Sequence, residues 1–196
     1  MAYLLDILGS VVIAGMVVMI LLTVNINTTT SSSALLFTTI EQRKITAATE
    51  LIQYDFYKIG YLVPGEKIAI ADSNEIKFYS DIDNNDVVDS IHYYVGETSD
   101  LSYTTNPNDK PLYRQRNWQD NLLAEIPVVD FNLSYFDSLG NTLDYSSLTN
   151  SAGRELIKSI KIEIKVESDE LYDDKYQTSE WKKKISPNNL REETLL

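Results

Sequence analysis

The sequence contains no cysteine, and this absence excludes several kinds of chemistry at once. Without thiolates the chain has no disulfide, no thiolate zinc site, no iron–sulfur cluster and no cysteine nucleophile. Histidine occurs once, as His92, so a multi-histidine metal site is impossible and a Ser-His-Asp triad would have to use that residue. With only 7 glycines, the chain also lacks the GxGxxG and GxxxxGK phosphate-binding runs. We therefore predict that the protein is not an enzyme.

Basic residues are also scarce, with 17 Lys and Arg against 29 Asp and Glu, a formal net charge of -12. An acidic chain is repelled by nucleic-acid phosphates, so we expect no nucleic-acid partner. Because no Lys or Arg precedes Arg43, flanking charges do not indicate the orientation of a membrane segment. What is abundant is hydrophobic sequence, 43% of 196 residues, which suffices for one core and an anchor.

The first hydrophobic segment occupies residues 1–24. Ile7–Val24 carries no charged side chain, and together with Tyr3–Leu5 it would form a helix about 33 Å long, enough to cross a bilayer. A cleavable signal peptide fits less well, because no basic region precedes the run and no small-x-small cleavage site follows it closely. We therefore predict a retained transmembrane helix.

Two segments with different helical character follow. Residues 25–33 read NINTTTSSS, and these poor helix formers are expected to melt or loosen the helix or to form a short exposed linker. Residues 34–60 are predicted to form an amphipathic helix that ends at Gly60, with Pro64 preventing its continuation. Its apolar stripe is Ile45, Ala48, Ile52, Phe56 and Ile59, and charged residues such as Asp55 are expected off the stripe. The stripe indicates packing on the following sheet, with a coiled-coil seam as the alternative.

Residues 61–196 are predicted to form a β-rich globular head. The alternation is clearest in Leu156–Val166, where isoleucines and a valine share one face and charged residues the other, as in an antiparallel strand with one solvated face. The other expected strands are Lys67–Ala71, Glu75–Tyr79, Ser90–Val95, Leu112–Gln115, Val128–Phe136 and Tyr176–Ile185. Their turn-sized gaps favour an antiparallel sheet. The predicted fold class is α+β, a long N-terminal helix whose second half packs on an antiparallel β-sheet.

The densest polar cluster suggests a metal site. Asp81, Asp83 and Asn85 place oxygen atoms at positions 1, 3 and 5 of a calcium-type loop, and Asp89 falls at position 9. Positions 6 and 12 lack the Gly and Glu of an EF-hand. Two interpretations stay open: a hairpin turn, because Asp and Asn favour turns, and a divalent-cation site, because clustered carboxylates repel one another. Calcium is the one possible cofactor that the sequence suggests.

The order of apolar helix, amphipathic helix and antiparallel sheet resembles that of type IV pilins and of the pseudopilins of type II secretion. The local segments that carry this resemblance are Ile40–Arg43, Tyr54–Tyr61, Asp81–Tyr94, Leu112–Arg114, Phe131–Gly140, Ile160–Val166 and Pro187–Leu190. They are similar to the helix end, the Asp-rich turn with its Tyr-Tyr strand, and the later strands of large minor pilins. The resemblance implies a pilin-like fold and a structural subunit of a type IV pilus-like or pseudopilus-like extracellular filament.

The resemblance also implies which residues assemble the filament. Prepilins carry a basic leader ending in Gly, followed by Phe-Thr-Leu-Ile-Glu, and Met1–Asp6 matches neither; either the leader has been removed or the subunit is inserted by another route. Asp6 would be the fifth residue without Met1, and an acid there pairs with a neighbour's N-terminal amine in pilins. Solvation of Asp6 among lipid headgroups is the alternative. Gly9 and Gly15 are small residues that let helices approach closely.

A location and a set of partners follow from the same resemblance. The protein would be a single-pass protein of the inner, cytoplasmic membrane before assembly, and would then lie in a cell-surface or extracellular filament. Its partners would be identical or related pilin-like subunits, contacted through the N-terminal helix. The alternative is a single-pass, membrane-anchored extracytoplasmic binding module that does not polymerise, in which Asp6 has no role.

Overall fold

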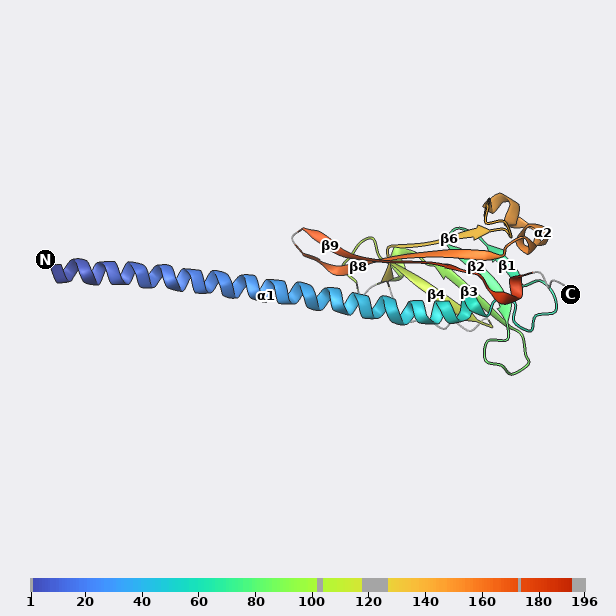
Figure 1. Cartoon of the computed structure of the whole chain (residues 1–196), viewed down its shortest axis with the longest axis horizontal. Coiled ribbons are helices and arrows are strands. Elements are labelled where there is room, and N and C mark those ends of the chain that lie inside the picture. Colours follow the sequence, from blue (N-terminus) through green and yellow to red (C-terminus); the bar gives the residue numbers. More distant parts are fainter. Residues whose placement is uncertain (1, 102–103, 118–126, 173, 192–196) are drawn as a thin grey trace. The chain divides into compact units, whose positions relative to one another are not determined.

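The structure is a computed structural model that describes residues 2–101, 104–117, 127–172 and 174–191. The chain divides into two compact units, Met1–Ile40 and Glu41–Leu196. Helix α1 (Ala2–Tyr57) forms the first unit and contributes its last turns to the second (Figure 1). An apolar N-terminal helix followed by antiparallel sheets makes this an α+β fold, as predicted.

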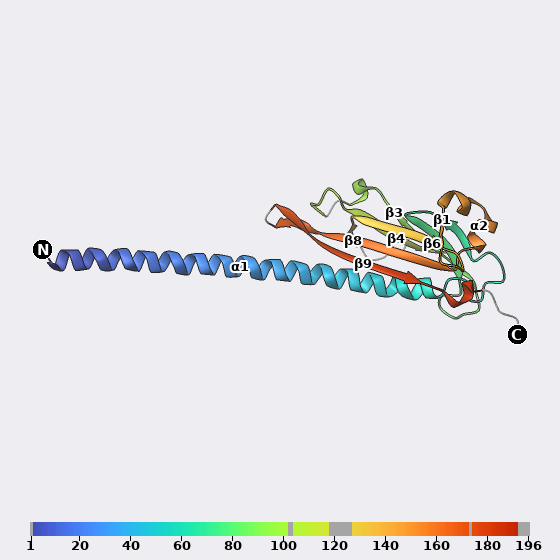
Figure 2. The ribbon, with the colours of Figure 1, turned by 45° about the horizontal axis from the view of Figure 1, so that its top comes forward.

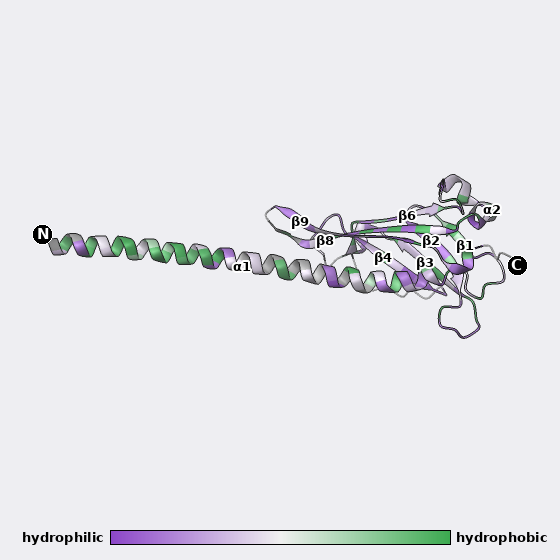
Figure 3. Cartoon of the chain, viewed as in Figure 1, coloured by the Kyte–Doolittle hydropathy of each residue, from purple (hydrophilic) through white to green (hydrophobic). Residues whose placement is uncertain are grey.

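The first unit consists of helix, and those of its apolar side chains that the structure describes are exposed. Its segment Asp6–Thr29 is long and apolar enough to cross a membrane, and none of that span is buried within the chain. The hydropathy colours of Figure 3 show this nearly continuous hydrophobic stretch in α1. A long apolar helix therefore exists as predicted, and its surface is free to contact lipid or other helices.

The predicted spacer at residues 25–33 is helical, so the expectation of a melted segment or a linker is wrong for this structure. Its hydroxyl groups bond to the helix itself: Thr28 donates to the carbonyl of Val24 at 2.8 Å, and Thr29 to that of Asn25 at 3.0 Å. Such bonds satisfy the threonine side chains inside a helix. Low intrinsic propensity is a weak preference, and here the flanking helix overrides it.

The second unit contains nine strands among its described residues, arranged in two antiparallel sheets. The first sheet has the order β1 (Ile68–Ala71), β2 (Glu75–Ser80), β3 (Asp89–Val95), β4 (Lys110–Arg116) and β5 (Pro127–Val128). The second has the order β7 (Thr142–Leu143), β6 (Asp130–Phe136), β8 (Ser159–Tyr172) and β9 (Lys175–Ile185). Short helices are η1 (Thr98–Asp100), η2 (Tyr145–Thr149), α2 (Ser151–Glu155) and η3 (Asn188–Leu190).

Every segment predicted to be a strand contributes to one of these sheets. Val128–Phe136 is divided between β5 and β6, and the strand expected from residue 156 begins at Ser159 and continues to Tyr172. The alternation of β8 is confirmed, because Ile160, Ile162, Ile164 and Val166 are all buried. β8 and β9 form the long hairpin seen in Figure 2.

The apolar stripe of α1 belongs to the core of the second unit. Ile45, Ala48, Ile52, Phe56 and Ile59 are buried, which confirms the prediction that the stripe packs on a sheet. The ring of Phe56 lies 5.6 Å from the rings of both Phe78 and Tyr93, on β2 and β3. Gly60 follows the helix with a φ of 77° and donates its N–H to the carbonyl of Tyr79, so the predicted stop is also found.

Asp55 corrects one detail of the predicted helix. It was expected off the apolar stripe, but it is fully buried. Its Oδ2 accepts hydrogen bonds from the hydroxyl of Tyr93 at 2.7 Å and from Nε of Arg114 at 2.5 Å. Burial, together with the negative charge of Asp55, raises the pKa of Tyr93, so its hydroxyl keeps the proton that it donates. A partner on β4 thus lets a charged residue face the core.

Candidate functional site

The first candidate site is the loop between β2 and β3. Ser80 pairs with Asp89 at its base, so the predicted hairpin is confirmed. Asp81, Asp83 and Asp89 each bring one carboxylate oxygen within 4.8 Å of the others, with Asp81 and Asp89 buried and Asp83 exposed. The structure therefore brings together three of the four ligands predicted for calcium.

Asn85, the fourth predicted ligand, is used within the loop itself. Its Oδ1 accepts the N–H of Val87 at 2.9 Å. The N–H groups of Asn85 and Asp86 donate to the two carboxylate oxygens of Asp81, at 3.1 and 2.9 Å. These are the local hydrogen bonds that favour Asp and Asn in turns, and they occupy oxygen atoms that a cation would need.

Arg116 of β4 supplies positive charge to this acidic cluster. Its Nη2 lies 2.5 Å from Oδ2 of Asp83 and 2.9 Å from Oδ2 of Asp89, and its Nε donates to Oδ1 of Asp89 at 3.0 Å. Burial raises the pKa of Asp89, but hydrogen bonds from Arg116, Asn117 and the N–H of Ile82 outweigh burial and lower it. Sequence reasoning missed Arg116, because only the pairing of β3 with β4 places it beside the loop.

Lys58, just after α1, adds a second positive charge at the other side of the loop. Its Nζ donates to the carbonyls of Asp81 at 3.1 Å and Ile82 at 2.8 Å, and to Oδ1 of Asn84 at 2.8 Å. Because Arg116 and Lys58 reduce the mutual repulsion of the three carboxylates, the geometry favours a turn whose negative charge is partly balanced by these two cations. Calcium binding at the four predicted residues stays a prediction.

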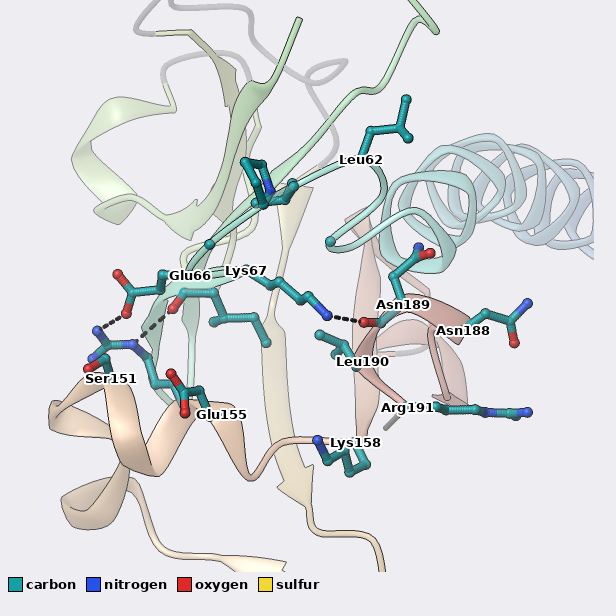
Figure 4. A pocket seen from close by; sticks show the side chains of 16 residues that line it. Leu62, Glu66, Lys67, Ser151, Glu155, Lys158, Asn188, Asn189, Leu190 and Arg191 are labelled. Atoms are coloured by element: carbon teal, nitrogen blue, oxygen red, sulfur yellow. Dashed lines mark hydrogen bonds and ion pairs between the residues drawn. The ribbon is translucent and has the colours of Figure 1, made fainter. Parts of the chain in front are cut away.

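The second candidate site is a cavity of about 860 Å³ in the second unit (Figure 4). One wall is organised by Arg154 of α2, which donates to the carbonyls of Ile68 at 2.9 Å and Leu148 at 3.0 Å and forms an ion pair with Glu66. The opposite wall includes Asn189, whose carbonyl accepts a hydrogen bond from Lys67. These bonds fix the positions of the polar lining side chains.

Gly153 sets how closely α2 approaches the preceding turn. A Cβ added there would lie 1.8 Å from the carbonyl oxygen of Ser147, so a side chain cannot be accommodated without backbone movement. The side chain of Asn150 caps α2 by accepting the N–H of Gly153 at 2.8 Å. The wall that carries Arg154 is thus held by a close backbone contact.

A smaller hollow of about 500 Å³ adjoins this cavity, since Lys158 and Arg191 line both. Its other lining residues come from the turn after β6, from the start of β8 and from the end of β9, where Lys184 lies 3.6 Å from the ring centroid of Phe136. Sequence reasoning did not find this hollow. The contributing segments are distant in sequence, and no local spacing pattern connects them.

No family model, curated protein or solved structure matches the chain. Its function therefore has to be argued from the exposed helix of the first unit and from the geometry of the second.

The predicted assembly residues all lie on the exposed helix. Asp6 is exposed, and a Cβ at Gly9 or Gly15 would meet no atom within 4 Å. Ser10, on the next turn from Asp6, donates its hydroxyl to the carbonyl of Ile7 at 2.8 Å. These positions are open surface on a single chain, and their role in assembly stays a prediction.

Proposed function

We propose that the chain is a structural subunit of a type IV pilus-like or pseudopilus-like extracellular filament. The observation that carries this proposal is the exposed apolar surface of Ile7–Val24. Soluble monomers rarely expose contiguous apolar patches larger than a few hundred Å². Lipid and neighbouring helices are the two environments that cover such a surface, and a filament subunit uses them in turn.

The sequence of this helix is consistent with its transfer from lipid to contacts with other helices. Lipid tails are as apolar as the helix, so association inside a filament depends on close packing and on pairing of polar groups. Gly9 and Gly15 present no side chain to a neighbouring helix and permit a close approach. Asp6 carries a carboxylate at the edge of the apolar stretch, where an N-terminal amine of a neighbour would stabilise it.

The second unit is a folded domain that is joined to this helix through the last turns of α1. In the proposal, the protein is a single-pass inner-membrane protein before assembly, and the second unit lies on the outer side of that membrane. Its partners are identical or related pilin-like subunits, and the assembled protein lies at the cell surface. The α+β order, in which the last turns of α1 enter the core of the sheets, supports this division between an assembly helix and a displayed domain.

Electron microscopy of full-length protein, sheared from cells or gently extracted, tests the proposal. We expect filaments with the apolar helices in a central core. Asp6→Ala should reduce filament yield strongly, whereas Asp6→Glu, which keeps the carboxylate, should retain most of it. Dispersed particles alone, both with this chain and with co-produced related subunits, would contradict the filament function.

The adjoining hollows of the second unit favour a second candidate function, a membrane-anchored extracytoplasmic binding module. In that case α1 is an anchor, and the purified chain is a monomer in detergent. Asp6→Ala would then change neither the oligomeric state of the chain nor the display of its second unit on the outer side of the membrane. Site-specific cross-linking between α1 helices in membranes separates the candidates, because only the filament subunit places these helices against one another.

A further inference from the structure

Three cationic side chains line the smaller hollow, and they come from three separate segments. Lys158 precedes β8, Lys184 lies near the end of β9, and Arg191 follows η3. Within the described ranges, none of the three side chains forms an ion pair with a carboxylate. In a chain of net charge -12, three cations that line one hollow are a local concentration of positive charge. They provide charge that is available to a ligand.

One carboxylate, that of Asp137, lines the same hollow in the part of the chain that the structure describes. Its Oδ1 accepts the N–H groups of Leu139 at 2.9 Å and Asn141 at 2.8 Å, and its Oδ2 accepts the side-chain amide of Asn141 at 3.0 Å. The hydrogen bond from the Asn141 side chain, with those from the turn, lowers the pKa of Asp137. This carboxylate is therefore held in its charged form by its own turn, and three cations against one carboxylate leave a net charge of +2 among the ionised side chains that line the hollow.

The position of Lys184 adds to the local positive charge. On the neighbouring strand β8, Lys161 stands directly opposite Lys184. Like charges opposed across strands are destabilising, so this pairing carries a cost within the fold. Lys161 has an acidic partner, with its Nζ 2.9 Å from Oε2 of Glu163, whereas Lys184 is placed over an aromatic ring. An anion in the hollow would offset the unpaired charge.

Part of the remaining lining matches a hydroxylated ligand. The larger cavity is also lined by Glu66, which pairs with Arg154, by Glu155, and by apolar side chains such as Val63 and Leu190. Ser138, Ser159 and Ser186 contribute hydroxyl groups to the smaller hollow, and the adjoining cavity adds Ser151 and Asn188. Hydroxyl and amide groups both donate and accept hydrogen bonds, as sugar hydroxyls do. Peptide recognition commonly uses a strand edge or apolar side-chain pockets, and Leu139 is the one aliphatic residue found in the smaller hollow among the described residues.

We propose that the two adjoining hollows bind an acidic saccharide. Its carboxylate or sulfate group lies against Lys158, Lys184 and Arg191, and its hydroxyl groups contact the serine and asparagine side chains of the lining. The larger cavity, about 860 Å³, gives room for further sugar rings beyond the charged one. All of these residues belong to the second unit, so the site operates with or without filament assembly.

Titration calorimetry on the full-length chain in a non-ionic detergent tests this proposal. The probes are polygalacturonate oligomers, which carry carboxylates, heparin oligosaccharides, which carry sulfates, and maltohexaose, which is neutral. We expect saturable binding of at least one acidic oligomer and none of maltohexaose. Raising NaCl from about 0.05 M to about 0.5 M should weaken the binding, because surface charge interactions are screened.

Matched variants assign the binding to this hollow. Lys158→Ala combined with Arg191→Ala should lower the affinity by at least about tenfold, since hydrogen bonds to charged groups are strong. Lys175→Ala removes the same charge at the opposite end of β9, roughly 30 Å along the strand from Lys184, and should leave the affinity unchanged. Circular dichroism of each variant checks that the sheets remain folded.

Several results would overturn the proposal. One is the failure of both acidic oligomers to bind, and another is equal binding by the double variant. Equal affinity for polyglutamate would assign the hollow to an acidic peptide instead of a saccharide. Equal affinity for inorganic sulfate would show that the site holds a small anion and makes no use of the sugar rings.

Discussion

Asp55 of α1 and Arg114 of β4 form a buried ion pair, with 2.5 Å between Oδ2 of the aspartate and Nε of the arginine. The aspartate side chain has no exposed surface, and the arginine side chain is 13% exposed. Tyr93 of the neighbouring strand β3 donates to the same carboxylate oxygen. The pair therefore joins the last turns of the helix to the central strands of the first sheet.

The first prediction concerns this pair. Asp55→Ala leaves the guanidinium of Arg114 buried without its partner, and we expect the second unit to lose about 3–5 kcal/mol of unfolding free energy. Thermal and denaturant unfolding followed by circular dichroism measure the loss. Asp55→Leu combined with Arg114→Met removes both charges and should recover most of the stability. A double variant as unstable as the single one would show that the unpaired charge does not cause the loss, and that packing or the lost hydrogen bond of the Tyr93 hydroxyl does.

The second prediction is a pH dependence due to Asp89. Its folded pKa lies below the ordinary value of 3.8, so the unfolded chain binds the proton more readily than the folded one. The stability from Asp89 is therefore fully present well above pH 3.8 and is lost as pH falls through 3.8 towards the folded pKa. Asp89→Asn should be less stable at neutral pH and should show a shallower decline on acidification. An identical acid profile in the variant would rule out Asp89 as a contributor.

The third prediction concerns the arginine that joins Asp83 and Asp89. Arg116→Ala should destabilise the second unit by about 2 kcal/mol, because Asp89 is left buried with less of its hydrogen bonding. Arg116→Lys keeps one positive charge but lacks the forked geometry that bonds both carboxylates, so an intermediate stability is expected. Thermal melts of the two variants and of the native chain measure the order of their melting temperatures. Equal stability of alanine and lysine variants would show that charge at this position contributes nothing.

The fourth prediction separates the two interpretations of the Asp-rich loop. With Arg116 bonded to Asp83 and Asp89, added calcium should leave the melting temperature of the native chain unchanged. Arg116→Ala should respond more to calcium, since the carboxylates then lack that neutralising group. A saturable rise in the melting temperature of the native chain, abolished by Asp83→Asn, would instead establish the calcium site.

Local periodicity was sufficient to predict much of this fold. The stripe that includes Ile52 and Phe56, and the alternation of Ile160 to Val166, each report which face of one element is buried. Neither depends on knowing where other elements lie. The helical state of residues 25–33 was harder to predict, because propensity favours a break there and hydroxyl-to-carbonyl bonds with the surrounding helix favour continuation.

Contacts set by strand pairing could not be predicted in the same way. Asp55 lies three residues from Ile52, at the edge of the stripe, yet its burial depends on Arg114, which is 59 residues away. Arg116 reaches the Asp-rich loop only because β4 pairs with β3 in one particular register. The smaller hollow is lined by segments that lie close together only in the folded chain. The hydrophobic periodicity of a single sequence does not indicate any of these tertiary contacts.

The glycine at position 153 limits which substitutions the wall of the larger cavity can accept. With a Cβ position only 1.8 Å from the oxygen of Ser147, any larger residue would displace the backbone that carries Arg154. Side chains such as Lys158 and Arg191 can be replaced without moving that wall, whereas Gly153 cannot. Redesign of the cavity is therefore confined to its side chains.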